Sequence, residues 1–167
     1  GGAVVVGAGR RIAVERVVAI EPMLHAARGV WGASVLPEYR ALLAGTPAER
    51  EDAIRRANAA LPASEIAAKL HAARFITLDT IAALGTQNAI DEGGWAFRAL
   101  LDEYPRPLLL ALADEKRTVF GAKDRDYARE HGGAHVHLEP FPGASHSLQR
   151  DAFDRFVPVL EAFLASS

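Results

Sequence analysis

HVHLEPFPGASHSLQRDAF, His135 to Phe153, has the pattern of a strand, a turn and the start of a helix. Apolar and polar residues mix at its beginning, as they do in a β-strand, and Pro142 and Gly143 then stop the strand. His146 follows directly, with a serine on each side, before an amphipathic run begins. The segment therefore presents an imidazole on a short turn between a strand and a helix.

Two further apolar runs have the character of buried strands. RVVAIEP, residues 16–22, is short and β-branched, and PLLLALAD, residues 107–114, is an uninterrupted apolar run. Strands that alternate with helical patterns predict a parallel sheet flanked by helices, so we expect the α/β fold class. The helices expected around these strands cover residues 3–13, 124–134 and 151–164.

The segment between the first two strands changes to an alanine-rich, helical character. Thr46 is a good N-cap and Pro47 a good first helical residue, so a helix is expected to begin there. Gly85 and the glycine pair at 93–94 are expected to separate the later helices. The helices predicted in this segment cover residues 46–61, 62–75, 77–87 and 93–104.

This change of character divides the chain into a core and an insertion. We assign residues 1–22 and 99–167 to the core and residues 23–98 to a helical cap. Five aromatic residues of the cap are candidates for lining an apolar pocket, since such pockets are mostly aromatic and aliphatic. They are Trp31, Tyr39, Phe75, Trp95 and Phe97.

Composition excludes several classes of function. The 167 residues carry 19 basic and 21 acidic side chains, a balance that predicts neither a nucleic-acid nor a membrane surface. No run reaches the roughly 18 apolar residues of a membrane span. The absence of cysteine excludes disulfides and thiolate sites and fits a cytoplasmic protein. His135 and His137 could chelate a metal from one strand face, but no third ligand is evident, so we expect no metal and no cofactor.

Polar residues that could carry chemistry follow each predicted strand. Glu21 ends the first, Asp114 and Glu115 follow the second, and His146 follows the third. In a parallel sheet, the loops after the strands converge over one crevice. A carboxylate and a histidine placed there suit an acid that orients an imidazole general base.

With these residues in place, the chain resembles the C-terminal part of an α/β-hydrolase with a helical cap. GGAVVV, residues 1–6, resembles the residues that follow the nucleophile in that family, and VERVVAIEPML, residues 14–24, resembles the next strand and its turn. PRPLLLALADEKRTVF, residues 105–120, resembles the penultimate strand, and FPGASHSLQRDAFDRF, residues 141–156, the histidine loop and last helix. The resemblance implies that His146 is the catalytic base.

The catalytic acid departs from the commonest pattern of that family. Most members carry G-x-x-D after the penultimate strand, and aligning Ala113 with that glycine puts Lys116 at the acid position. A subset carries its acid after the preceding strand, where this chain has Glu21. The resemblance therefore favours Glu21, with Asp114 and Glu115 as alternatives.

The nucleophile implied by the resemblance sits on a G-x-S-x-G elbow, which this chain lacks. We expect a serine upstream of Gly1, and we expect the isolated 167-residue chain to be inactive. The implied activity is hydrolysis of an ester or related acyl bond of a small, largely apolar substrate.

Two other functions remain open. One is an epoxide hydrolase with an upstream aspartate nucleophile, against which Tyr39 counts as the only tyrosine well inside the cap. The other is a non-catalytic ligand-binding or interaction fragment that pairs with a separate N-terminal chain or forms a homo-oligomer, because a thin sheet leaves an edge exposed.

Overall fold

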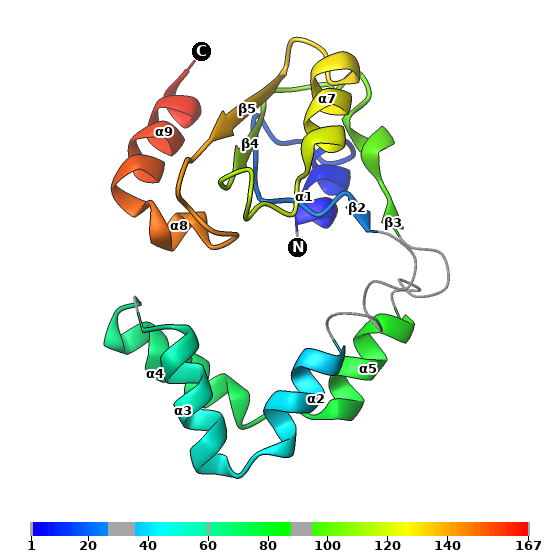
Figure 1. Cartoon of the computed structure of the whole chain (residues 1–167). Helices are drawn as coiled ribbons and strands as arrows, with labels where there is room; N and C mark the ends of the chain where they lie inside the picture. Colours follow the sequence, from blue (N-terminus) through cyan, green and yellow to red (C-terminus); the bar gives the residue numbers. More distant parts are fainter. Residues whose placement is uncertain (1, 27–35, 60, 88–94, 167) are drawn as a thin grey trace. The chain divides into compact units, whose positions relative to one another are not determined.

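The computed structural model describes residues 2–26, 36–59, 61–87 and 95–166, and it divides the chain into two units (Figure 1). The core unit comprises Gly1–His25 and Ala96–Ser167, and the helical unit comprises Ala26–Trp95. Residues 23–25 and 96–98, which the sequence placed in the cap, fall in the core unit. Each unit is described by itself.

The core unit contains a three-stranded parallel sheet with the strand order β1-β4-β5. Its strands are β1 (Val17–Ile20), β4 (Leu108–Leu112) and β5 (Val136–Pro140). All five residues of the central strand β4 are buried, which explains why its sequence is an uninterrupted apolar run. The predicted α/β class, with a parallel sheet flanked by helices, is confirmed.

Helices cover both faces of this sheet (Figure 1). Leu108, Leu110 and Leu112 point to the face covered by α1 (Gly2–Gly9), η2 (Arg98–Leu101) and α7 (Ala122–His131). Ala111 points to the opposite face and packs against α8 (Leu148–Asp151) and α9 (Phe153–Ala165). The side chains of β4 alternate between the two apolar clusters, as a pleated strand requires.

The helical unit holds two helix pairs, α2 with α5 and α3 with α4. Its helices are α2 (Leu36–Ala44), α3 (Pro47–Ala57), α4 (Ala63–Ala73) and α5 (Leu78–Gln87). The predicted start of α3 is confirmed, because Thr46 is its N-cap and forms a capping box with Glu49. The two-residue strands β2 (His25–Ala26) and β3 (Trp95–Ala96) pair where the chain passes from one unit to the other.

The helix predicted over residues 93–104 is wrong for the part that the structure describes. Trp95 and Ala96 form β3, and the Phe97 N–H donates to the carbonyl of Leu24, so the backbone is extended there. Only the 3-10 helix η2 follows. A pairing with a segment so distant in sequence leaves no local pattern, and the alanines and leucines of this stretch favoured a helix.

Smaller differences concern glycine and helix length. Helix α5 runs through Gly85, which was expected to end it. The predicted helix over 151–164 begins two residues later than expected, because α9 covers Phe153–Ala165 and Asp151 ends the separate helix α8. Within the described ranges, no helix has the length and apolar character needed to cross a membrane.

Candidate active site

Glu21 occupies the first position after β1 and has an unusual backbone. Its φ is +45°, in the left-handed region that non-glycine residues rarely adopt. Among the described non-glycine residues, only Glu103 shares a positive φ. Such a conformation costs about 1–3 kcal/mol and persists where the surroundings enforce it. The Glu21 side chain is fully buried, so the strained turn places a carboxylate inside the end of the sheet.

Three donors satisfy this buried carboxylate. Oε1 accepts from the Ala113 N–H at 2.6 Å and from the Thr118 hydroxyl at 2.7 Å, and Oε2 accepts from the Val119 N–H at 2.8 Å. All three donors belong to the end of β4 and the loop after it. A buried carboxylate is an acceptor-only group that is costly without such partners, so the loop is built around Glu21.

His146 lies on the loop between β5 and α8, and its ring faces the same carboxylate. The distance from His146 Nδ1 to Glu21 Oε2 is 3.6 Å, and the imidazole is 60% exposed. This distance lies within ion-pair range but beyond an ordinary hydrogen bond. Hydrogen bonds between catalytic groups are often long in the absence of substrate and shorten when it binds, so the arrangement suits an acid behind a histidine base.

The two residues come together across the central strand. Because β4 lies between β1 and β5, Glu21 reaches over the end of β4, where it meets the Ala113 N–H. The carbonyl of Ala113 in turn accepts a hydrogen bond from the buried guanidinium of Arg125 at 3.1 Å. Ala113 is therefore fixed from both sides, and it fixes Glu21.

The alternative acids lie elsewhere around the loop. The Asp114 carboxylate accepts hydrogen bonds from the Gly143 and Lys116 N–H groups at 2.9 and 3.0 Å, and these bonds lower the pKa of Asp114. The Glu115 side chain is 85% exposed and lies 3.7 Å from Arg125. Of the three carboxylates predicted from the sequence, Glu21 is the one within ion-pair distance of His146.

Two polar residues near the site were not predicted. Thr118 holds Glu21 through its hydroxyl, and Asp151 accepts a hydrogen bond from the Ser145 N–H at 2.7 Å. Asp151 had a sequence signal, since an acid in the first turn after a loop commonly binds main-chain N–H groups. Thr118 had none, because its role depends on how an irregular loop folds back.

Ser145, the residue before the histidine, takes part in the hydrogen bonds of the loop. The Ser145 N–H donates to Asp151, and the Ser145 side-chain oxygen accepts the Ser147 N–H at 3.2 Å. Hydrogen bonding from Ser145 lowers the pKa of Asp151, against the opposing effect of desolvation. These bonds hold the loop. The geometry thus gives Ser145 a structural role in the loop.

Residues considered for other sites do not gather into one. Among the residues with described coordinates, no three histidine, aspartate or glutamate side chains could hold a metal together. The ring of His137 packs against Phe163, with centroids 6.1 Å apart, which is a packing role on the strand face.

The helical unit contains a groove of about 650 Å³ between α3 and α4. Basic and apolar side chains line it, among them Arg50, Ile54 and Leu70. The aromatic residues predicted to line an apolar pocket do not line this groove. Phe75 is instead 70% exposed, and Trp31 lies outside the described residues.

Comparison of the sequence with protein families and with curated proteins gives no significant match.

Proposed function

We propose that this chain supplies the acid and the histidine of a serine hydrolase with the α/β-hydrolase fold and a helical cap. The single observation that carries the proposal is the approach of the exposed His146 ring to the buried Glu21 carboxylate, with 3.6 Å between Nδ1 and Oε2. Both residues follow strands of one parallel sheet, where reactive groups of open α/β sheets collect. Their order along the chain, acid before histidine, agrees with the resemblance.

In the proposed reaction His146 acts as the general base. Its Nε2 takes the proton of a serine hydroxyl while that oxygen forms a bond to the acyl carbon of the substrate. The same nitrogen then returns the proton to the departing alkoxide, and a water molecule repeats the sequence to release the acid and restore the serine. Glu21, behind Nδ1, orients the ring and stabilises the imidazolium that forms in both halves of the reaction.

The nucleophilic serine in this proposal precedes Gly1 in the complete gene product. The substrate class is an ester, or a related acyl bond, of a small and largely apolar molecule. The exposed face of His146 supports this arrangement, because a second group must approach the ring from outside the residues that bury Glu21. The 167-residue chain alone is accordingly expected to give no turnover.

The test is hydrolysis of short-chain p-nitrophenyl esters by the complete gene product and by its variants. We expect His146→Ala to lower kcat/KM by about 10³-fold or more, and Glu21→Gln by about 10²- to 10⁴-fold, since removing members of such a triad has effects of this order. Glu115→Gln is the matched control, because its carboxylate is exposed, and it should retain activity.

Two results would overturn the proposal. Unchanged hydrolysis in His146→Ala would remove the base, and turnover by the isolated chain that depends on His146 would place the nucleophile within these residues. A fluorophosphonate probe that labels a serine upstream of Gly1 would support the serine assignment. Transfer of ¹⁸O from solvent water to an upstream aspartate in a single turnover would instead indicate the aspartate nucleophile of an epoxide hydrolase.

A further inference from the structure

Two residues of the loop that carries His146, Phe141 and Ala144, are buried in the core, and hydrogen bonds hold the rest of the loop. Residues 141–147 lie between β5 and α8 without regular secondary structure. The imidazole is 60% exposed, so packing around the ring does little to fix its direction. Its position over Glu21 must therefore come from the backbone of the loop.

Asp114 fixes the loop before the histidine. Its Oδ2 accepts the Gly143 N–H at 2.9 Å, and its own N–H donates to the Ala144 carbonyl at 3.1 Å. Its Oδ1 accepts the Lys116 N–H at 3.0 Å, which fixes the carboxylate itself. Gly143 has a φ of +81°, so the chain turns sharply at the point that Asp114 grips.

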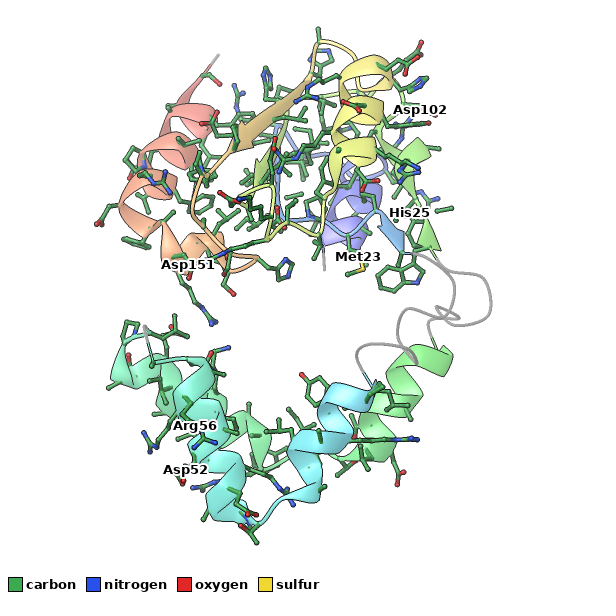
Figure 2. The ribbon with its side chains drawn as sticks, in the orientation of Figure 1. Met23, His25, Asp52, Arg56, Asp102 and Asp151 are labelled. Atoms are coloured by element: carbon green, nitrogen blue, oxygen red, sulfur yellow. The ribbon has the colours of Figure 1, made fainter. Side chains whose placement is uncertain are left out.

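Asp151 fixes the loop immediately next to the histidine. Its Oδ2 accepts the Ser145 N–H at 2.7 Å. Figure 2 shows Asp151 at the end of α8, which packs into the core through the buried Leu148. The residue before His146 is thus tied to a helix that is itself anchored.

Two exposed arginines also donate side-chain hydrogen bonds to the loop. Arg155 donates to the Pro142 carbonyl at 2.9 Å, and Arg117 donates to the Gly143 carbonyl at 3.4 Å. Both arginines hold carbonyl groups, whereas the two aspartates hold N–H groups. All four contacts involve a charged side chain and are stronger than neutral hydrogen bonds. The aspartates differ from the arginines in what they bind, because they hold the N–H groups of Gly143 and of Ser145, the residue next to the histidine. The Asp151 bond, at 2.7 Å, is the shortest of the four.

We propose that Asp114 and Asp151 are positioning residues that clamp the loop on both sides of Ala144 and so hold the His146 ring over Glu21. This inference rests on the proposed function. It also gives Asp114, an alternative catalytic acid in the sequence, a different role, because Asp114 acts on the backbone of the histidine loop while Glu21 faces the ring.

The first arm of the test measures ester hydrolysis by the complete gene product carrying Asp114→Ala or Asp151→Ala. We expect each variant to lower kcat by about 10- to 100-fold with KM changed by less than about twofold, because displacing a catalytic group by about 1 Å costs up to about 10²-fold. Asp126→Ala is the matched control, since Asp126 lies in an exposed ion pair with Arg129, and it should keep the wild-type kcat.

The second arm measures amide hydrogen exchange in the 167-residue chain and does not depend on turnover. Asp114→Ala should speed exchange of the Gly143 amide about tenfold or more, and Asp151→Ala that of the Ser145 amide, while the Leu110 amide in β4 stays protected. Asp114→Asn keeps one acceptor oxygen, so it should restore protection at only one of the Gly143 and Lys116 amides.

The outcomes separate the two proposals. If His146→Ala abolishes hydrolysis and both aspartate variants keep the wild-type kcat, the clamp is wrong and the proposed function stands. If the loop amides exchange at wild-type rates in the variants, the clamp is wrong whatever the activity. If His146→Ala keeps full activity, the proposed function fails, and with it the catalytic purpose of the clamp.

Discussion

The core unit and the helical unit bury their apolar side chains to very different extents. In the core unit, two clusters of buried residues enclose the sheet on both faces, and β4 is buried along its whole length. In the helical unit, Ala26 and Ile81 are the buried hydrophobic residues among those described. The core unit is therefore closely packed, whereas few buried side chains hold the helices of the helical unit.

This difference explains where a precise site can form. Fixing a side chain to a fraction of an ångström requires neighbours that cannot move, and the core unit supplies them through buried groups such as Arg125 and Ala113. The groove between α3 and α4 has no comparable support, because none of the residues of these two helices is buried. We therefore expect segments of the core unit to open less readily than helices α3 and α4 of the helical unit.

The largest expected effect is in amide hydrogen exchange. Amides of β4 should exchange about 10³-fold more slowly than those of α3 and α4, because local opening of a segment with few buried contacts costs little free energy. The measurement is native-state exchange followed by NMR at neutral pH. Equal protection in the two regions would show that the helical unit is stabilised by contacts that its burial does not reveal.

A pair of matched core and groove substitutions should differ by several kcal/mol. Leu110 is fully buried, so Leu110→Ala is expected to lower the free energy of unfolding by about 3 kcal/mol. Leu70→Ala removes the same atoms from a half-buried position in the groove and should cost less than about 1 kcal/mol. Urea denaturation with both variants gives the two values, and a larger loss for Leu70→Ala would reverse the comparison.

How much of this contrast was predictable depends on the range of the interactions. Two of the three strands followed from the apolar runs at 16–22 and 107–114, and the third from the mixed apolar and polar residues at 135–141 that end in Pro142 and Gly143. The parallel arrangement followed from the alternation of these strands with helical segments. The approach of Glu21 and His146 followed from the geometry of strand ends in a parallel sheet.

The wrong helix prediction and the unpredicted site contacts have one cause, which is that they depend on contacts between segments distant in sequence. The stretch 93–104 favoured a helix locally, and the hydrogen bond from Phe97 to Leu24 overrides that preference. Two hydrogen bonds depend on loop conformations that no periodicity in the sequence encodes. They join the Thr118 hydroxyl to Glu21 and the Gly143 N–H to Asp114. The weak burial of the helical unit could not be predicted from the sequence either, since an amphipathic pattern indicates which face of a helix is apolar but not what packs against that face.

Two glycines of α1 test how tightly the core unit is packed. A Cβ at Gly9 would collide with the Tyr104 hydroxyl and the Val17 side chain, both buried, so Gly9→Ala should cost about 2 kcal/mol. At Gly7 the nearest atom is Leu100 Cδ1 at 3.6 Å, so Gly7→Ala should be neutral or stabilise the helix by up to about 1 kcal/mol. Thermal unfolding separates the two, and similar values would mean that α1 can shift on the sheet.

The smallest expected effect lies in the capping box of α3 and concerns pH. The hydrogen bonds from the Thr46 N–H and hydroxyl hold the pKa of Glu49 below its ordinary value. A carboxyl whose pKa is lowered in the folded state contributes stability that is complete above its unfolded pKa and is lost as the pH falls through the lowered value. Protection of the α3 amides should therefore decline in acid, starting in the usual titration range of glutamate and continuing below it.

Glu49→Gln should remove this pH dependence while keeping an acceptor for the Thr46 N–H. Thr46→Ala should instead weaken α3 at every pH by about 1 kcal/mol, because the N-cap itself is lost. Since α3 contains no buried residue, these losses should stay local and leave the exchange of β4 amides unchanged. If the β4 amides lost protection together with those of α3, the two units would unfold together. They would then differ in how closely they are packed but not in stability.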